Sequence, residues 1–291
     1  MIKIIIIILI IILIFLILNY LLRPTIEKYS NRPIIWAYWE TLPGKSKPGY
    51  IDLCLESIQH NCSKCFDIKI LDNNTIYNFI PEIKEYDLSR LPVQQKVDIY
   101  RYFLLYKYGG IWLDADTLVI KCFCKYYKLL DKHDYIGFGC GYDKSECRKL
   151  ESGYGKPING IMISRPKTSY LKCIIDNCIE SLKNDNLDYH DLGRVLMSKC
   201  YDKLSKESDW KYHHVPSKCQ EYDSKGNKLN NIFKPFNIED CKEERVFFPL
   251  YNTAPGYPEW FKKLSKDELM KRDDLEIYPL IEMSFKTKRC Y

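Results

Sequence analysis

The sequence predicts an α/β domain with a mostly parallel central sheet, preceded by one N-terminal transmembrane helix. Short strand-like segments alternate with helix-length segments from residue 33 to about residue 201, which is typical of a sheet covered by helices. The chain has 291 residues, of which 46% are hydrophobic and 28% charged, a balance that allows one domain to bury a substantial core. The start of the chain stands apart because it is almost entirely aliphatic.

That aliphatic segment, Ile4–Leu22, has the length of a membrane-spanning helix, which needs roughly 20 residues. A cleaved signal peptide would require small residues at a cleavage site after the apolar run, and the sequence Asn19–Pro24 has none. We therefore expect residues 1–22 to be an uncleaved anchor and residues 23–33 to be a linker. Positive charges lie on both sides of the segment, so the positive-inside rule does not decide its orientation.

The first half of the domain is predicted from hydrophobic periodicity and from breaker residues. Apolar side chains recur at helical spacing in 49–60, and residues 66–72 alternate as in a strand. Residues 92–108 form a helix with Pro92 at its first turn, and Gly109-Gly110 ends it. The predicted elements are strand 33–40, helix 49–60, strand 66–72, a short helix or turn at 75–80, and helix 92–108.

The second half continues the alternation and then becomes harder to interpret. Apolar runs bounded by turn residues predict strands, and longer amphipathic runs predict helices. After about residue 205 the segments are short and rich in proline, and we expect loops and short elements packed on the same domain. The predicted elements are strands 111–113, 117–120, 135–139 and 158–164, and helices at about 168–183 and 189–201.

Two carboxylates, Asp114 and Asp116, stand one residue apart where a buried strand ends. Residues two apart on a strand face the same side, so both groups can converge on one point. Ligands of open α/β sheets bind at the carboxyl ends of strands, and oxygen donors suit Mn²⁺ or Mg²⁺. An Asp-x-Asp pair alone is a weak signal, because a polar turn between two strands has the same sequence.

The helix before this pair adds a second charged pair, Asp98 and Arg101, which share a helix face at spacing i, i+3. A surface salt bridge is the ordinary interpretation of such a pair. The helix is otherwise apolar and leads directly into the acidic strand, which favours a site instead. A carboxylate can hold sugar or ribose hydroxyls, and a guanidinium pairs with charged oxygens.

Together these residues resemble a known family pattern. The pattern begins with Asp-x-x-Arg at 98–101 in a helix of aromatic and aliphatic residues. It continues with Tyr-Gly-Gly at 108–110, an aromatic residue, and Asp-x-Asp at 114–116. This pattern is similar to the DXD-containing sugar transferases, which include capsular polysaccharide synthesis proteins and fungal-type mannosyltransferases. The segments at 34–40 and 53–62 also resemble the opening of the capsular family. The resemblance covers residues 34–165, and we recognise nothing after about residue 205.

The resemblance implies a GT-A fold in residues 34–291, with a nucleotide-sugar donor, Mn²⁺ or Mg²⁺, and a glycan, lipid or protein acceptor. Residues 34–165 would bind the donor and metal, and residues 166–291 would form the acceptor and lid part. By position, Asp116 would ligate the metal, and Asp114 would bridge metal, ribose or sugar. Asp98 and Arg101 would hold the sugar and the phosphates of the donor. Trp36 would lie beside the base, with Trp39 as the less favoured alternative. Asn159 and Gly160 would lie near the donor sugar.

Some details stay open within this interpretation. Gly160 either allows a close approach or is a simple strand glycine. A metal or phosphate ligand from the C-terminal part is common in this fold, and the choice among His190, Asp191, His213 and His214 remains open. Retention of anomeric configuration is expected from the resemblance alone. The expected topology, a signal-anchor with a lumenal domain, also rests on the resemblance.

Two other function classes compete with a transferase. A carboxylate-based glycoside hydrolase could use Asp114 and Asp116 if they lie about 5 Å apart, and it would need neither metal nor nucleotide. A membrane-anchored sugar-binding protein without turnover would not need all four charged residues. Nucleic acid is not an expected partner, because the net charge of +6 comes from interspersed lysines and acids.

Thirteen cysteines are many for this length, and an odd number leaves at least one thiol free or intermolecular. Cys62/Cys65 and Cys122/Cys124 are close pairs. The Cys-x-x-Cys at 62–65 is a weak metal signal, because no second such motif or histidine pair follows, and buried thiols or lumenal disulfides explain it equally well. Glycosylation sequons begin at Asn61 and Asn73 and slightly favour a lumenal location.

Overall fold

A computed structural model describes residues 32–139, 156–217, 219, 220, 233, 241–252 and 257–286. Nearly all of these belong to one compact unit, Pro33–Tyr291. The expected anchor, Ile4–Leu22, lies outside the described residues. Among the residues that are described, no helix is both long and apolar enough to cross a membrane.

The unit is a mixed α/β structure built on a six-stranded sheet with the order β2-β1-β3-β6-β5-β7. Strand β6 runs antiparallel to both of its neighbours, whereas the β2-β1-β3 and β5-β7 neighbours are parallel, so five strands point the same way. The prediction of a mostly parallel central sheet is confirmed. The strands are β1 (Ile34–Tyr38), β2 (Asp67–Leu71), β3 (Gly110–Leu113), β5 (Tyr135–Gly139), β6 (Ile161–Ser164) and β7 (Tyr212–Pro216).

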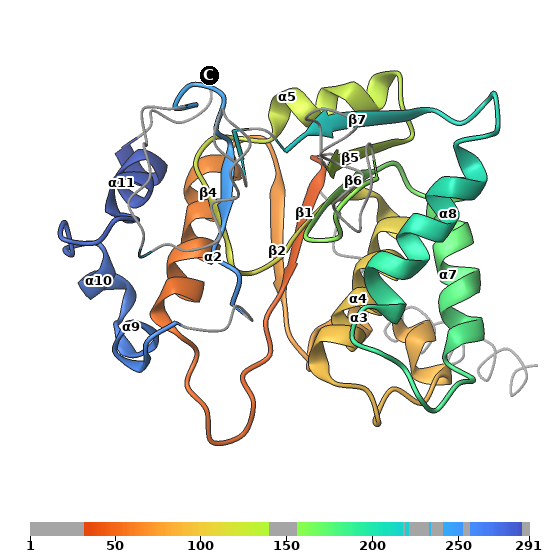
Figure 1. Ribbon diagram of the computed structural model, residues 1–291, viewed down its shortest axis with the longest axis horizontal. Helices are drawn as coiled ribbons and strands as arrows, with labels where there is room; N and C mark the ends of the chain where they lie inside the picture. The colour runs from red at the N-terminus through yellow and green to blue at the C-terminus, as the bar shows by residue number, and fades with distance from the viewer. Residues whose placement is uncertain are drawn as a thin grey trace, which may run out of the picture. The chain divides into compact units, whose positions relative to one another are not determined.

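Helices cover both faces of this sheet (Figure 1). One face carries α4 (Val93–Tyr108), α7 (Ser169–Ser181) and α8 (Leu196–Leu204). The other face carries α2 (Gly49–Cys62), α11 (Tyr278–Lys286) and a two-stranded antiparallel sheet. The remaining elements are β4 (Thr117–Val119), β8 (Phe247–Pro249), α3 (Ile76–Phe79), η1 (Pro81–Glu85), α5 (Cys124–Tyr127), η2 (Lys128–Asp131), η3 (Asp191–Val195), α9 (Glu259–Lys263) and α10 (Lys266–Leu269).

Alternation along the strands explains why there are two cores. In β3, Ile111 and Leu113 face the core on the α2 side, and Trp112 faces the core on the α4 side. Strands β1, β5 and β6 divide their side chains in the same way. Because successive strand residues point to opposite faces, apolar runs of this kind are expected wherever a sheet is covered on both sides.

The predicted helices and strands up to about residue 201 are present in the structure, with one difference. The helix predicted at 189–201 is broken into the π-helical turn η3 and the helix α8, with non-helical backbone angles at Gly193. After residue 205, where we expected loops and short elements, the structure has strands β7 and β8 and helices α9 to α11. These late elements are three to nine residues long, too short for a clear periodic signal.

Gly109 and Gly110 end α4 and start β3 with φ angles of +67° and +100°. Only glycine adopts such angles without strain. A Cβ at Gly110 would also lie 2.3 Å from the backbone oxygen of Ile34 on the neighbouring strand. These two glycines therefore allow α4 to turn directly into the central strand that leads to the acidic pair.

The packing of α2 against β4 depends on Asn61, which is only 5% exposed. Its side-chain amide donates to the backbone oxygens of Ser57, Val119 and Ser284 at 3.1, 2.9 and 2.9 Å. These bonds tie α2, β4 and α11 together. The sequon at Asn61 is therefore inaccessible in the folded protein, whereas Asn73 is exposed.

We expect Asn61→Ala to lower the free energy of unfolding by about 2–3 kcal/mol, because it leaves buried carbonyl oxygens without their donor. The matched control, Asn73→Ala, removes an exposed amide and should change stability by less than about 0.5 kcal/mol. Urea denaturation of both variants measures the difference. Equal stabilities would show that Asn61 does not hold these elements together.

Candidate active site

The acidic pair sits in a tight turn between the central sheet and the small one. Asp114 follows β3, and its backbone amide donates to the backbone oxygen of Gly160 at 2.9 Å. The backbone oxygen of Asp114 accepts from the amide of Thr117 at 3.0 Å, and β4 begins there. Both carboxylates thus lie at the carboxyl end of β3, the edge at which α/β sheets bind ligands.

Arg101 organises one side of the site and is only 5% exposed. Its guanidinium lies 3.2 Å from Oδ1 of Asp98 and 3.2 Å from Oδ1 of Asp114, and it donates to the backbone oxygen of Asn159. It also lies over the ring of Trp112 at 5.1 Å, in cation–π geometry. The Asp98–Arg101 ion pair is therefore buried and belongs to a cluster of charged residues, and it is not a surface salt bridge.

The described contacts of the Arg101 guanidinium go to protein groups, so it holds Asp98, Asp114 and Asn159 in place. The role at the donor phosphates that the resemblance implied for Arg101 stays a prediction. The charge of Arg101 still acts on the site, since no water separates it from Asp114 at this distance.

Asp98 and Asn159 form the neighbouring part of the site. The side-chain amide of Asn159 donates to Oδ1 of Asp98 at 3.0 Å. Gly193 closes over them, because a Cβ there would lie 2.7 Å from Oδ2 of Asp98 and 3.0 Å from Nδ2 of Asn159. The π-helical turn η3 is thereby brought against two of the predicted donor-binding residues.

Gly160 allows a close approach. A Cβ at this position would lie 3.1 Å from Oδ2 of Asp114, closer than most side-chain contacts. The glycine thus leaves room for the carboxylate, which supports the interpretation of close approach over that of an incidental strand glycine.

The other side of the site comes from a residue that sequence reasoning missed, Asn252. Its backbone amide donates to Oδ2 of Asp116 at 2.7 Å, and the amide of Leu250 donates to the backbone oxygen of Asp116 at 2.8 Å. The hydroxyl of Tyr50, at the start of α2, donates to the side-chain oxygen of Asn252. The only sequence signal was that a strand-like segment, β8, precedes Asn252.

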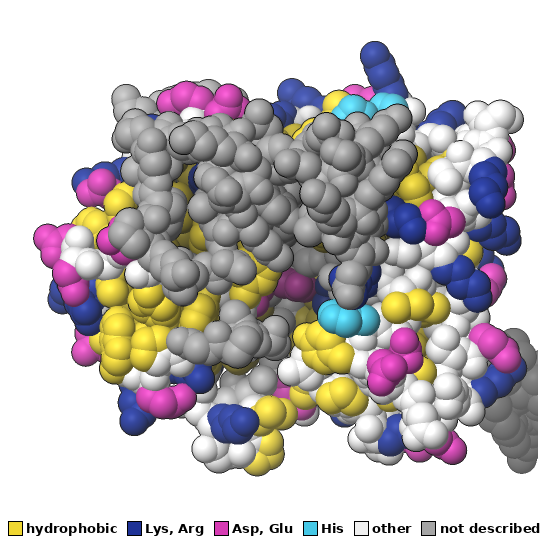
Figure 2. All heavy atoms as spheres, viewed as in Figure 1, with side chains coloured by type: hydrophobic (Ala, Val, Ile, Leu, Met, Phe, Trp, Pro, Cys, Tyr) yellow, Lys and Arg dark blue, Asp and Glu magenta, His cyan; other side chains and the backbone are white. Residues whose placement is uncertain are grey.

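An aromatic cluster borders Tyr50 on this side. Its ring stacks on Phe261 of α9 at 5.4 Å and meets Tyr257 edge-on at 5.8 Å. Trp260, which is 45% exposed, packs against Phe261, and Figure 2 shows hydrophobic side chains gathered over this part of the surface. The residues beside Asp116 are therefore backed by rings, which limits their movement.

The expectation for Trp36 is corrected by the structure. Trp36 is 0% exposed, donates from its indole nitrogen to the backbone oxygen of Gly109 at 2.9 Å, and packs against Phe79 and Tyr108. It cannot border a nucleotide base. Trp39, which follows β1 at the binding edge of the sheet, is half-buried, and its buried indole nitrogen has no partner among the described residues.

The four candidates for a C-terminal ligand separate into two groups. His190 caps η3, and Asp191 begins it, in the turn that reaches Asp98 through Gly193. His213 and His214 lie on β7, the edge strand two positions away from β6 in the sheet. None of the four makes a described contact with Asp114 or Asp116, whereas Asn252 does.

Burial dominates the electrostatics of the three carboxylates. Desolvation, together with the charge of the neighbouring Asp114, raises the pKa of Asp116 to about 6. Desolvation also raises the pKa of Asp98 to about 6, against the opposing effect of Arg101. The pKa of Asp114 is raised by burial, while Arg101 and the indole of Trp112 oppose the shift.

The donor set fits a hard divalent cation. Three carboxylates share one guanidinium, so the site carries excess negative charge that burial makes unfavourable. Within the described residues, Oδ1 of Asp116 and Oδ2 of Asp114 receive no hydrogen bond, which leaves them available as ligands. Carboxylate oxygens of this kind bind hard cations such as Mg²⁺ or Mn²⁺ in preference to soft metals.

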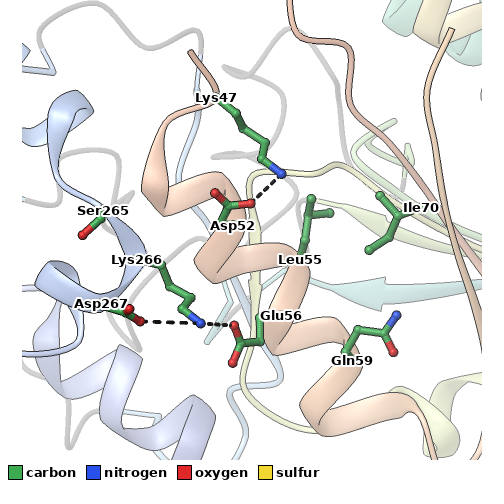
Figure 3. A pocket seen from close by; sticks show the side chains of 9 residues that line it. All are labelled: Lys47, Asp52, Leu55, Glu56, Gln59, Ile70, Ser265, Lys266 and Asp267. Carbon is green, nitrogen blue, oxygen red and sulfur yellow. Dashed lines mark hydrogen bonds and ion pairs between the residues drawn. The ribbon is translucent and has the colours of Figure 1, made fainter.

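A separate surface pocket of about 610 Å³ lies on the solvent face of α2. Figure 3 shows Lys47 directed at Asp52, and Lys266 between Glu56 and Asp267. The ion pairs Lys47–Asp52 and Lys266–Glu56 are both 2.5 Å long. Since Tyr50 points to the buried side of α2, this pocket is not part of the acidic site.

Sequence comparisons relate this chain to known proteins. The sequence model of a family described as capsular polysaccharide synthesis protein matches residues 17–251. An uncharacterized glycosyltransferase of Acanthamoeba polyphaga mimivirus is 26% identical over 204 residues, which cover 64% of this chain and 72% of that protein.

Two solved structures show a distant likeness. The bifunctional glycosyltransferase WbbM is 11% identical, with a TM-score of 0.47 over 92% of this chain and 51% of that chain. The galactosyltransferase LgtC, in complex with donor and acceptor sugar analogs, is 9% identical, with a TM-score of 0.43 over 89% of this chain and 97% of that chain.

We expect Tyr50→Phe to weaken Mn²⁺ binding several-fold, because the hydroxyl that holds Asn252, and through it Asp116, is lost. The control is Tyr170→Phe, which removes a buried hydroxyl that donates to the backbone oxygen of Met197 at 3.0 Å. Each change should cost about 1 kcal/mol of stability. Calorimetric titration with Mn²⁺ separates them, and equal affinities would contradict a role for Tyr50 at the site.

Proposed function

Because the chain belongs to the capsular polysaccharide synthesis protein family, we propose that it is a metal-dependent glycosyltransferase with a GT-A fold. It moves a hexose from a nucleotide-sugar donor to a glycan, lipid or protein acceptor. The observation that carries the proposal is the buried pair of Asp98 and Arg101 joined to the half-buried Asp114, with Asp116 beside it, at the binding edge of the sheet. The mimivirus relative, which is named a glycosyltransferase, supports it.

The reaction breaks the bond between the anomeric carbon and the diphosphate oxygen. Negative charge builds on the leaving diphosphate and positive charge on the sugar carbon. A bound Mn²⁺ or Mg²⁺ supplies Lewis-acid charge that neutralises the diphosphate. Asp114 and Asp116 are the residues that would hold it, in keeping with their half-buried, mutually repelling carboxylates.

The remaining residues orient the donor and hold the carboxylates of Asp114 and Asp116 in position. Arg101 compensates part of the negative charge and prevents Asp114 from turning away from the sheet edge. Asp98 and Asn159, joined by a hydrogen bond, supply oxygen atoms near the position of the sugar, where they can stabilise positive charge. Trp39 replaces Trp36 as the ring proposed to contact the base.

Residues 166–291 are proposed to bind the acceptor and to exclude water during transfer. Two segments from this part support the idea, since Gly193 lies against Asp98 and Asn252 lies against Asp116. Water exclusion matters because hydrolysis of the donor competes with transfer. Retention of configuration stays part of the proposal without a residue assigned to it.

We further propose that residues 1–22 anchor the enzyme in a membrane, that residues 23–33 form a linker, and that the catalytic domain is lumenal. The aliphatic sequence of Ile4–Leu22 supports the anchor. The exposed sequon at Asn73 is compatible with a lumenal domain.

The central test assays nucleotide diphosphate release from a panel of nucleotide sugars by the full chain in detergent with Mn²⁺. We expect Asp116→Asn to reduce kcat at least about 100-fold, because it removes a charged ligand and leaves the fold intact. EDTA should abolish wild-type activity, and Mn²⁺ should restore it. The control Glu56→Gln changes a carboxylate on the solvent face of α2 and should retain activity. Full activity in EDTA would refute the metal-dependent proposal.

Arg101→Lys tests the organising guanidinium with its charge retained. One ammonium cannot reach Asp98, Asp114 and the Asn159 carbonyl together, so we expect kcat/KM for the donor to fall about 10- to 100-fold. The control Arg165→Lys alters an exposed pair, 3.8 Å from Asp134, and should leave the kinetics unchanged. Parent-like kinetics in Arg101→Lys would show that charge alone suffices.

Endoglycosidase treatment of protein made in a eukaryotic cell tests the topology. A lumenal domain should carry glycan at the exposed Asn73, so its mobility shift should vanish in Asn73→Gln. Asn61→Gln should not change the shift, since Asn61 is buried. Absence of any shift, with digestion by protease added to intact microsomes, would assign the domain to the cytosol.

A further inference from the structure

One member of the Cys62/Cys65 pair, Cys65, meets both members of the Cys122/Cys124 pair in the structure. Cys65 lies just past the end of α2, and Cys122 and Cys124 lie just past the end of β4. The sulfur atoms of these three residues are all within 4.8 Å of one another. Cys62–Cys65 is only a weak metal motif in the sequence, because the cysteines that lie near Cys65, Cys122 and Cys124, come from a distant segment.

The surroundings of the three sulfurs are partly closed. Cys122 is buried, and Cys65 and Cys124 are half-buried. Phe66 and Tyr127 meet edge-on at 5.5 Å, joining the segments that follow Cys65 and Cys124. The three sulfur atoms are therefore held together by the fold, and those of Cys65 and Cys124 belong to half-buried side chains that a small ion can reach.

Two of the sulfurs form a disulfide, Cys122–Cys124, and Cys65 is free. Zinc–sulfur bonds of about 2.3 Å at tetrahedral angles separate the sulfurs by about 3.8 Å. The three sulfurs therefore lie within reach of one tetrahedral cation once the Cys122–Cys124 bond is broken.

We propose that, in the reduced protein, Cys65, Cys122 and Cys124 bind a soft divalent cation of the zinc class. Thiolates select such ions over Mg²⁺ and Mn²⁺, so this site is chemically distinct from the acidic pair. Reduction by a phosphine converts the disulfide into two thiols and the phosphine into its oxide. Binding then releases three protons from the three thiols, and water can fill the fourth position.

The site would act as a staple, separate from the chemistry of the acidic pair. Tyr50 and Asp116 lie at the beginnings of α2 and β4, whereas the cysteines follow the ends of the same two elements. Helix α2 has 14 residues and is thus about 20 Å long. A cation at the cysteines would join α2 to the β4–α5 connection at the end opposite to the acidic pair.

The experiment uses the full chain in detergent, reduced with a phosphine and incubated with Zn²⁺, then freed of loose metal by gel filtration. We expect about one equivalent of zinc by mass spectrometry of the metal. Replacement by Co²⁺ should give a thiolate-to-cobalt charge-transfer band, which carboxylate ligands do not produce. Cys65→Ser, Cys122→Ser and Cys124→Ser should each lose the band and most of the zinc.

Two controls keep the result specific. Cys178→Ser changes another free buried cysteine and should retain zinc, as should Asp116→Asn. If Cys122→Ser fails to fold, Cys65→Ser at a half-buried position gives the answer. A folded Cys65→Ser variant with undiminished zinc and cobalt signals would overturn the proposal, as would a reduced wild-type protein that binds neither ion.

Discussion

The burial of Arg101 among carboxylates is the constraint on which the site depends. One guanidinium lies within 3.2 Å of Asp98 and of Asp114, at the junction of α4, β3 and the segment before β6. Removing these charges from water is unfavourable unless they pair, and the pairs therefore fix the relative positions of three elements. With Asp116 added, carboxylates outnumber the guanidinium, and this surplus of negative charge is what the proposed cation would neutralise.

The second face of the site depends on the layer formed by α2, β4 and β8. Strand β4 continues directly from Asp116, pairs with β8, and is tied to α2 by Ser57 and Asn61. Pairing with β8 delivers Asn252 to Asp116. Thus the part of the chain that carries little recognisable pattern completes the environment of the most recognisable motif.

Local sequence rules predicted most of the architecture because the relevant forces act locally. Gly109-Gly110 ends a helix since both positions need positive φ, and the two-residue alternation in β3 divides Trp112 from its neighbours. The spacing of Asp98 and Arg101 correctly indicated one shared helix face. The nature of their contact, buried instead of exposed, followed only from the packing of α4 between the sheet and α7.

The sequence by itself determined the alternation of strands and helices and the proximity of Asp114 to Asp116, since neighbouring residues on a strand end cannot lie far apart. Tertiary structure alone decided that Trp36 is a core residue, that the amide of Asn61 is occupied by carbonyl oxygens, and that Asn252 reaches the acidic pair. It also decided that the sulfur atoms of Cys65, Cys122 and Cys124, which come from two distant segments, lie close together. The physical reason is the same in each case. These outcomes depend on which segments become neighbours across the sheet, and neighbours far apart in sequence leave no periodic signal in either segment alone.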